Sequence, residues 1–384
     1  MIAEYRSAFN AGFKPAKYAE FLSELDHRCG THVKFRNCET PCFFPRPILQ
    51  RMVKCGRELI SQITGNAAYL QAASAHIPAQ FKVPNEAAHP LFIQADFGLD
   101  SSLNPKLVEI QGFPSLYAYQ PLLAEVYRDV YHLDPDLRYM LTDSNYWELL
   151  RKAILGDHAP ENTILMEINP SLQKTLADFL ITEQRLGVRT VSVTDVHRKG
   201  SRLFHGDTPI HRIYNRVIVD ELEREHIQPG FDFRDDVDVE WAGHPNWYFL
   251  LSKFSIPWLK HECVPRTWLL HDLKQLPDHL ENYVLKPLFS FAGLGVKIGP
   301  TRDEVAQADP AQYILQEKIE FAPVIETPFG PTKAEVRIMY VWLDGAAAPE
   351  AVTTIIRMGR GKMMGVDHNR DMEWVGASAG FTPP

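Results

Sequence analysis

The segment from about residue 140 to residue 245 alternates between two hydrophobic patterns, and this alternation restricts the fold more than any other feature of the sequence. The stretch "NTILMEI" is typical of a buried strand, "QKTLADFLITEQRLG" of a helix that ends at Gly187, and "VRTVSVTDV" of a second strand. "IHRIYNRVIVDELERE" then predicts a strand that runs into a helix. Strand–helix–strand order is the signature of a parallel sheet, so we expect an α/β fold.

The chain is too long for one compact core, so we expect several domains. It has 384 residues, whereas single cores stop growing at roughly 250–300 residues. Residues 1–85 are predicted to be mostly helical, because "PAKYAEFLSELDHR" and "ILQRMVKCGRELISQI" carry apolar residues at three- and four-residue spacing. Further units span residues 86–135, 136–250 and 251–384. In the third of these four units, "DFRDDVDVEW" alternates acidic and apolar residues and predicts a strand with one solvated face.

The charge balance excludes one class of partner. A net charge of −8 leaves no surplus of lysine and arginine for a nucleic-acid backbone. The start "MIAEYRSAFNAGF" has no basic region followed by an apolar one, and no run of roughly 18 uninterrupted apolar residues occurs. We therefore expect a cytoplasmic protein that binds neither nucleic acid nor a membrane. The sequence does not indicate an oligomeric state.

The cysteines raise a zinc hypothesis. Their odd number, five, argues against a disulfide framework. Four of them lie in the first sixty residues, namely Cys29, Cys38, Cys42 and Cys55. His27 and His32 lie nearby, although the spacing contains no Cys-x-x-Cys pair. The alternative is that these thiols are ordinary buried side chains.

The stretch "KLVEIQGFPSL" (residues 106–116) combines a buried strand with two polar groups. Because side chains alternate across a strand, Glu109 and Gln111 project from the same face. Asp96 can join them if its segment pairs as a hairpin across the turn "DSSLNP". Oxygen donors at the end of a strand suit a hard cation such as Mg²⁺. The alternative is an edge strand with one wetted face.

The last third of the chain carries features typical of phosphate binding. "YVLKPLFSFAGLGVKIGP" predicts a strand with Lys286, a loop with Gly293 and Gly295, and a second strand. A glycine loop can offer backbone N–H groups to a polyphosphate, and a lysine adds a point charge. Further on, "EVRIMYVWLDG" and "AVTTIIRMGRGK" predict paired strands, on which Arg337 and Arg357 could bind phosphoryl or carboxylate oxygens. A surface ion pair with Glu335 is the alternative.

Taken together, residues 252–384 resemble the ATP-grasp ligases. "SKFSIPWLKHECVPRTWLL" is similar to the opening of that domain, "YVLKPLFSFAGLGV" to its lysine strand and phosphate loop, and "YILQEKIE" to its adenine hinge. "EVRIMYVWLDG", "IIRMGRG" and "VDHNRDMEWVGASAGF" are similar to the arginine-bearing strands and asparagine loop of the ribosomal-protein glutamate ligases. The matches occur in the same order as in the family.

The family's metal-binding strand is missing after residue 381, and "ADFGLDSSLNPKLVEIQGFPSL" resembles it on the amino-terminal side. That order resembles the circularly permuted members, glutathione synthetase of the eukaryotic type and glutathionylspermidine synthetase. The resemblance implies Asp96, Glu109 and Gln111 as ligands of Mg²⁺. Two positions depart from the pattern: Gln111 replaces the usual asparagine, and Gln94 stands where glutathionylspermidine synthetases have arginine.

The resemblance implies a circularly permuted ATP-grasp fold. Residues 1–85 would be a helical segment, 86–135 the displaced metal-binding part, 136–250 a Rossmann-like domain and 251–384 the nucleotide-binding domain. The implied activity is an ATP- and Mg²⁺-dependent ligase that joins a carboxylate to an amine through an acyl phosphate and releases ADP. Its substrates would be small molecules such as an amino acid, a peptide or a polyamine.

The same resemblance distributes roles among residues. The nucleotide phosphates would meet Lys286 and Lys253 under a loop from Ser290 to Gly295 that includes Gly293. The adenine would meet the backbone of Gln316, Glu317, Lys318 and Ile319, with Glu335 near the ribose. The γ-phosphate and acyl phosphate would meet Arg337 and Arg357, with Asn369 close by. The acceptor pocket would include Phe113–Gln120, within reach of Asn215 and Arg216.

Two other classes of function remain open on the sequence. Gln111 favours an ATP-binding module that has lost catalysis and serves as a sensor or scaffold. The cysteine-rich start favours a zinc-stabilised interaction protein.

Overall fold

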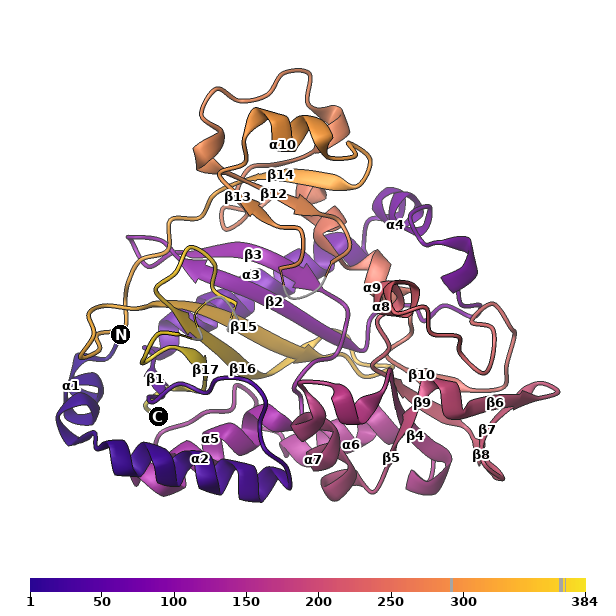
Figure 1. Ribbon diagram of the computed structural model, residues 1–384, viewed down its shortest axis with the longest axis horizontal. Coiled ribbons are helices and arrows are strands. Elements are labelled where there is room, and N and C mark those ends of the chain that lie inside the picture. Colours follow the sequence, from indigo (N-terminus) through magenta and orange to yellow (C-terminus); the bar gives the residue numbers. More distant parts are fainter. Residues whose placement is uncertain (291–292, 366–368, 370) are drawn as a thin grey trace.

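The molecule is built around a central antiparallel sheet of five strands (Figure 1). The computed structural model describes residues 1–290, 293–365, 369 and 371–384. The strand order is β17-β16-β15-β2-β3. The strands are β2 (Phe92–Leu99), β3 (Pro105–Gln111), β15 (Lys333–Val341), β16 (Glu350–Gly359) and β17 (Gly376–Ser378). Early strand β2 therefore pairs directly with late strand β15.

The β2–β3 hairpin and the β15–β16 pair confirm the pairings predicted from the sequence. The side chain of Asp100 closes the hairpin turn by accepting hydrogen bonds from the backbone N–H groups of Ser102 and Asn104, at 2.9 Å each. The register shifts after Asp96, so that β3 contains one extra residue, Val108. This bulge leaves the Val108 carbonyl available to a partner outside the ladder.

A parallel sheet of order β10-β9-β4-β5 confirms the alternating pattern of the middle segment. It comprises β4 (Thr163–Glu167), β5 (Arg189–Ser192), β9 (Arg212–Asn215) and β10 (Glu240–Ala242). Helices α6 (Tyr146–Leu155), α7 (Leu176–Leu186) and α8 (Val219–Arg224) accompany it, and β6 (Val196–Lys199), β7 (Arg202–His205) and β8 (Thr208–Ile210) form a small antiparallel sheet beside it. The molecule is thus of mixed α/β type.

The strand predicted over "DFRDDVDVEW" is largely wrong. Only its end, from Glu240, is a strand. The Asp232 side chain accepts hydrogen bonds from the Arg234 backbone N–H at 2.9 Å and from its guanidinium. Such local side-chain-to-backbone bonds compete with a sheet ladder and form a turn instead.

A smaller antiparallel sheet of order β11-β14-β12-β13 stands above the central sheet in Figure 1. Its strands are β11 (Thr267–Leu269), β12 (Tyr283–Pro287), β13 (Lys297–Ile298) and β14 (Tyr313–Glu317), with helix α10 (Arg302–Gln307). Helix α9 (Trp247–Leu250) and the 3₁₀ segment η5 (Lys253–Trp258) connect the parallel sheet to this smaller sheet.

Residues 1–85 are mostly helical, as predicted, and pack around the central sheet. They contain α1 (Ala3–Gly12), α2 (Pro15–Cys29), β1 (Cys42–Phe43), α3 (Arg46–Thr64) and α4 (Ala67–Ser74), and α5 (Tyr119–Tyr131) follows the hairpin. Helix α3 lies on the sheet at Tyr340 of β15, whose hydroxyl donates to the Val53 carbonyl at 3.0 Å. Strand β1 pairs in parallel with β18 (Gly380–Phe381), and the Ile2 backbone N–H donates to the Phe43 carbonyl of β1, so both ends of the chain reach this pair.

No helix in the described residues is both long and apolar enough to cross a bilayer.

Candidate functional site

Seven charged side chains converge between the central sheet and the smaller sheet. They come from β2, β3, β15, β16, β12 and η5, and they are Asp96, Glu109, Glu335, Arg337, Arg357, Lys286 and Lys253. We call this set the charge cluster. Strand register explains why the members of the charge cluster on the central sheet lie close together. Asp96 of β2 pairs with Glu109 of β3 on one side and with Arg337 of β15 on the other. Glu335, two residues before Arg337, projects from the same face and pairs with Arg357.

Asp96 is the centre of the charge cluster and is only 1% exposed. Arg337 binds both oxygens of Asp96 in a bidentate contact, with Nε donating to Oδ1 at 2.5 Å and Nη2 to Oδ2 at 2.7 Å. Arg357 donates to Oδ2 as well and also donates from Nε to Glu335 at 2.7 Å. Burial alone would raise the pKa of Asp96, but the two guanidinium charges outweigh it and hold that pKa below its usual value. Asp96 is therefore a carboxylate.

Glu109 lies between a cation of the central sheet and one of the η5 segment. Its Oε2 is 3.4 Å from Lys253 Nζ, and its Oε1 is 3.5 Å from Arg337 Nη2. Burial would raise the pKa of Glu109, yet the charge of Lys253 and those of the neighbouring cations lower it overall. Both contacts are longer than a tight charge-assisted hydrogen bond, so Glu109 is the carboxylate of the cluster that is held less firmly.

Lys286 links the two sheets physically. Its Nζ donates to the Val108 carbonyl, which the bulge in β3 leaves available, at 2.9 Å, and to Gln316 Oε1 at 2.6 Å. Burial lowers the pKa of Lys286 to about 8, and the charge of Glu109 acts in the opposite direction. A substantial fraction of this amine is therefore charged near neutral pH and can meet an anion.

The predicted phosphate loop begins beside the second lysine. Lys253 Nζ donates to the Ser290 carbonyl at 2.9 Å, so η5 and the loop are tied together. Gly293 and Gly295 both have positive φ, at 76° and 75°, which is why glycine is required at these turn positions. Residues 291 and 292 of the predicted loop lie outside the described residues.

Gln111 lies beside the charge cluster in an amide pair that the sequence reading did not anticipate. Its Nε2 donates to Gln94 Oε1 at 2.8 Å, and Arg337 Nη1 donates to the same oxygen at 2.8 Å. Gln94 in turn donates to the Ser115 carbonyl at 2.8 Å. Gln94 lies two residues before Asp96, so strand periodicity could have placed it on this face.

The predicted adenine hinge follows β14. The backbone N–H groups of Glu317 and Lys318 donate at 2.8 Å to the carbonyls of Arg266 and Asn282, respectively. These two donors are thus already used within the smaller sheet. Within the described residues, the buried Nε2 of Gln316 has no hydrogen-bond partner, and Gln316 already contacts Lys286 through its oxygen.

Asn369 braces a loop in this structure. Its Oδ1 accepts from the backbone N–H groups of Arg360 and Gly361 at 3.1 and 2.9 Å, and its Nδ2 donates to the carbonyls of Met363 and Gly365. These contacts connect it to the segment after β16. Residues 366–368 and 370 of the predicted asparagine loop lie outside the described residues.

The predicted acceptor segment, Phe113–Gln120, meets the carboxyl ends of the parallel strands. Arg216, just after β9, donates to the Pro114 carbonyl, and buried Asp178 accepts from the Ala118 and Tyr119 backbone N–H groups at 2.9 Å each. Burial raises the pKa of Asp178.

Other residues near these strand ends have local roles. Asn215 accepts a hydrogen bond from the Val217 backbone N–H at 3.3 Å. Glu167 ends β4, and burial raises its pKa to about 8 although the charge of Arg216 opposes this. The sequence analysis did not select Glu167 or Asp178. The features that could have indicated them are a carboxylate at the end of a strand for Glu167 and one in the first turn of a helix for Asp178.

The four cysteines of the first sixty residues do not gather into one site. Cys38 and Cys42 contact Met358 in the core, whereas Cys29 ends α2. Cys55 lies instead near the fifth cysteine, Cys263. The zinc hypothesis in its original form is therefore wrong.

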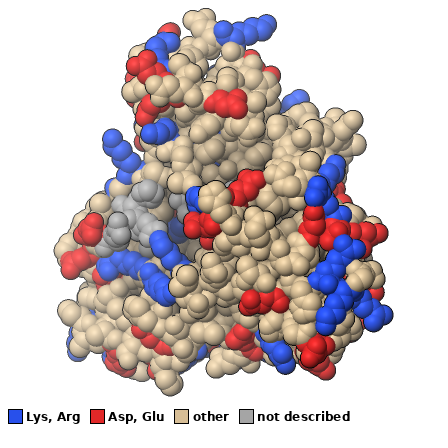
Figure 2. All heavy atoms as spheres, turned by 45° about the vertical axis from the view of Figure 1, so that its right-hand side comes forward, with Lys and Arg blue, Asp and Glu red and all other residues tan. Residues whose placement is uncertain are grey.

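The charge cluster is a packed interior set, and two open cavities lie elsewhere. The first cavity, of about 660 Å³, is lined by residues 80–81, 222–223 and 226–233. The second, of about 550 Å³, is lined by residues that include Asn85, His158 and Glu240. Figure 2 shows lysines and arginines interspersed with aspartates and glutamates on the face drawn there.

No family model matches this sequence, and no curated protein matches it. Among solved structures, the fold is similar to that of a glutathione synthetase-like effector from Globodera pallida in its apo form, with a TM-score of 0.60 and 12% identity. The match covers 97% of this chain and 98% of the other. At that coverage most of residues 1–85 must belong to the shared fold. The comparison therefore shows a glutathione synthetase-like fold.

Proposed function

We propose that this protein is an ATP- and Mg²⁺-dependent ligase that joins a small carboxylate to an amine through an acyl phosphate. The observation that carries the proposal is the charge cluster, in which four cations from the two sheets and from η5 gather around three carboxylates, two of them buried. The glutathione synthetase-like fold supports it. We further propose that the fold is a circularly permuted ATP-grasp fold with the domain boundaries expected from the sequence. The contacts of Ile2 and Phe381 with the same residue, Phe43, support this, because chain ends that lie close can be rejoined.

The donor set fits a hard cation. Asp96, Glu109 and Gln111 supply two carboxylates and an amide on neighbouring strands, and Mg²⁺ prefers such oxygen donors together with substrate phosphates. A metal ion held there would neutralise phosphate charge. Arg337 and Arg357 now neutralise Asp96, so binding requires that they turn toward the nucleotide.

The chain's own residues would act by positioning and by charge neutralisation. Lys286 and Lys253 hold the nucleotide phosphates, and Arg337 and Arg357 hold the γ-phosphoryl group and the substrate carboxylate oxygen that attacks it. The amine then displaces phosphate from the acyl phosphate. Such transfer needs no covalent nucleophile. Arg216 and the segment Phe113–Gln120 would receive the acceptor.

A second candidate is an ATP-binding module without catalysis. Three observations favour it. Both oxygens of Asp96 are already bonded to arginine, and Gln111 is tied to Gln94. The similar solved structure is named as an effector.

One experiment separates these functions. The purified chain is mixed with ATP, Mg²⁺ and pooled amino acids, peptides and polyamines, and ADP, phosphate and new amide products are measured by mass spectrometry. ADP with a matching product supports the ligase, whereas ATP binding without ADP supports the module.

Lys286→Met tests the nucleotide site itself. We expect it to abolish ATP binding in calorimetry, because the cation that bridges the two sheets is lost. Lys297→Met, which removes an exposed lysine from the same small sheet, is the matched control and should bind ATP normally. Unchanged ATP affinity in Lys286→Met would remove the site assignment.

A further inference from the structure

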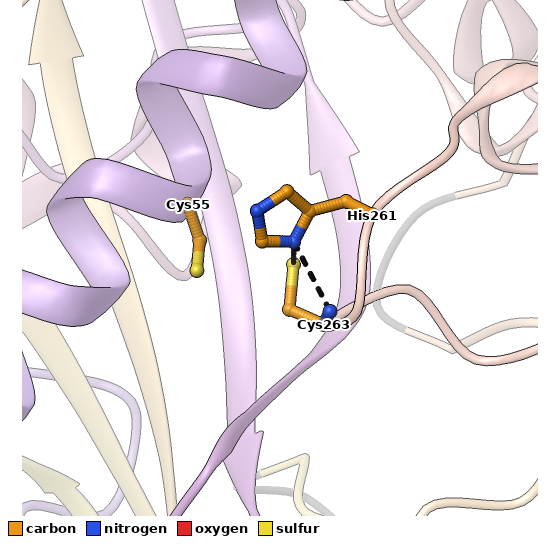
Figure 3. Close-up of side chains that lie close together, drawn as sticks. All are labelled: Cys55, His261 and Cys263. Atoms are coloured by element: carbon orange, nitrogen blue, oxygen red, sulfur yellow. Dashed lines mark hydrogen bonds between the residues drawn. The ribbon is translucent and has the colours of Figure 1, made fainter.

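Two segments far apart in sequence bring two thiols and an imidazole together outside the charge cluster. Cys55 lies on α3, and His261 and Cys263 follow η5. One ligand atom of each lies within 4.8 Å of the others. Figure 3 shows Cys55 at the edge of its helix that is nearest to His261 and Cys263.

The orientation of His261 suits a metal ligand. Its Nε2 lies 3.0 Å from Glu58 Oε2, and its Nδ1 lies 3.0 Å from Cys263 Sγ and accepts from the Cys263 backbone N–H at 3.1 Å. A carboxylate only accepts, so Nε2 carries the proton and Nδ1 is the basic nitrogen; a metal ion bound at Nδ1 would replace the Cys263 N–H as its partner. A histidine held by a carboxylate through its second nitrogen is the usual arrangement at protein metal sites.

Both segments are anchored to the sheet independently of any metal. The Cys263 carbonyl accepts from the Leu107 backbone N–H of β3 at 2.7 Å. The Gln62 side chain on α3 bonds the backbone of Lys260 twice, at 3.0 and 3.2 Å. The Tyr340 hydroxyl of β15 donates a hydrogen bond to the Val53 carbonyl of α3. The three candidate ligands are therefore positioned in advance, which favours binding.

We propose that Cys55, His261 and Cys263 bind one thiophilic cation, Zn²⁺, and that this ion fastens α3 to the segment beside β3. Two thiolates and an imidazole are a ligand set that selects zinc over hard cations. Tetrahedral zinc holds such atoms about 3.5–3.8 Å apart, given Zn–S of about 2.3 Å and Zn–N of about 2.0–2.1 Å. The structure needs adjustments of only about 1 Å to reach this geometry. The fourth position is left for water or an external ligand.

The protein encloses most of this site. Cys55 and Cys263 are 7% and 1% exposed, so the ion would be shielded from competing ligands except at the side of His261. This site does not depend on the proposed ligase activity.

Cobalt titration of the reduced, chelator-treated full-length chain tests the proposal. We expect one Co²⁺ per chain, with a thiolate-to-cobalt charge-transfer band that Zn²⁺ removes. Cys55→Ala should lose the band, whereas Cys29→Ala, which changes a buried thiol elsewhere, should keep it. Glu58→Gln should bind Zn²⁺ about 10–100-fold more weakly, as is typical when the partner of a histidine ligand is removed. Glu58 is 44% exposed in its side chain, so this variant should remain folded, and circular dichroism checks that it does.

Three outcomes would overturn the proposal. The first is a wild-type chain without the band, and the second is a Cys55→Ala variant that retains it. The third is a reduced wild-type chain that binds no metal but, after mild oxidation with diamide, shows a Cys55–Cys263 link in a peptide map. In that case the two cysteines form a redox pair.

Discussion

At the scale of single residues, Asp96 shows how the charge cluster accommodates a buried carboxylate. A buried carboxylate is costly unless it is paired, and Arg337 and Arg357 supply the pairing. The side chains that the sequence divides into metal ligands and phosphate ligands therefore contact one another. In the proposed function, Mg²⁺ binds the carboxylates in place of the arginines, and the phosphates of ATP bind the arginines and lysines in place of the carboxylates.

Glu109→Gln tests this exchange at the less firmly held carboxylate. We expect ATP to bind, because the cations remain, and turnover to fall by about 10²–10³-fold, the usual effect of losing one charge contact in the transition state. Calorimetry and an ADP-release assay measure the two quantities. Glu148→Gln, at an exposed position on α6, is the control. Persistent turnover in Glu109→Gln would contradict the metal role.

Glu167 predicts a pH dependence of stability. Its pKa is about 8 in the folded protein and near 4.5 when exposed, so the folded state holds the proton more tightly. Its contribution to stability is fully present below about pH 4.5 and is lost as the pH rises through 8, at about 1.4 kcal/mol per pH unit. Glu167→Gln should lack this decline relative to wild type in urea unfolding across that range. Parallel pH profiles of the two proteins would show that Glu167 is not the group responsible.

At the scale of elements, the bulge in β3 connects two sheets. The extra residue Val108 turns its carbonyl toward Lys286 of β12, and the same turn of chain places Glu109 opposite Asp96. A regular ladder would pair that carbonyl within the sheet. The bulge is thus the local feature that lets the smaller sheet meet the central one at the charge cluster.

Helix α3 depends on one glycine for its contact with the sheet. A Cβ on Gly56 would lie 2.1 Å from Tyr340 Oη and 2.9 Å from Cζ of the same ring. We expect Gly56→Ala to lower the free energy of unfolding by about 1–3 kcal/mol, as overpacking does. Denaturant unfolding measures it. Gly12→Ala, where a Cβ meets no atom within 4 Å, should be neutral or stabilising.

The ring contact can be tested separately. In a Tyr340→Phe background the nearest clashing atom is gone, so the cost of Gly56→Ala should shrink. An equal cost in both backgrounds would show that the contact is not the cause.

At the scale of the whole molecule, the two chain ends meet in one layer. The Ile2 backbone N–H donates to the Phe43 carbonyl at 3.1 Å, and Phe43 pairs with Phe381. The β2–β3 hairpin is likewise inserted beside β15, although β15 comes much later in the sequence. The β2–β15 pair thus joins segments far apart in sequence, whereas the other neighbours in the central sheet follow one another in the chain.

This arrangement predicts that the chain tolerates a new permutation. We expect a variant with its ends joined by a Gly/Ser linker of about 9 residues, which spans about 16 Å, and opened between Ala347 and Ala348 to fold with a wild-type-like circular dichroism spectrum and cooperative melting. The opening lies in an exposed turn between β15 and β16. A variant opened between Val336 and Arg337, inside β15, is the control and should not fold. Failure of the first variant would show that the ends are not as close as the structure has them.

Much of the fold follows from local patterns in the sequence. The parallel sheet, the hairpin and the β15–β16 pair are visible because their apolar periodicity reports which face of each element is buried. The strand predicted around Asp232 was wrong, because the Asp232 side chain accepts a hydrogen bond from the nearby Arg234 backbone N–H and forms a turn despite the alternating pattern. Several polar groups of the charge cluster could be selected from the sequence, although their proposed roles stay predictions.

The sequence by itself determined which side chains share a face of a strand: Asp96 with Gln94, Glu109 with Gln111, and Glu335 with Arg337. Only the tertiary structure decided that β2 lies beside β15, and so which charges neutralise one another, and that Cys263 meets Cys55. The physical reason is that periodicity is a property of a short segment, whereas pairing between distant segments of the chain is selected by the free energy of burying the whole surface at once.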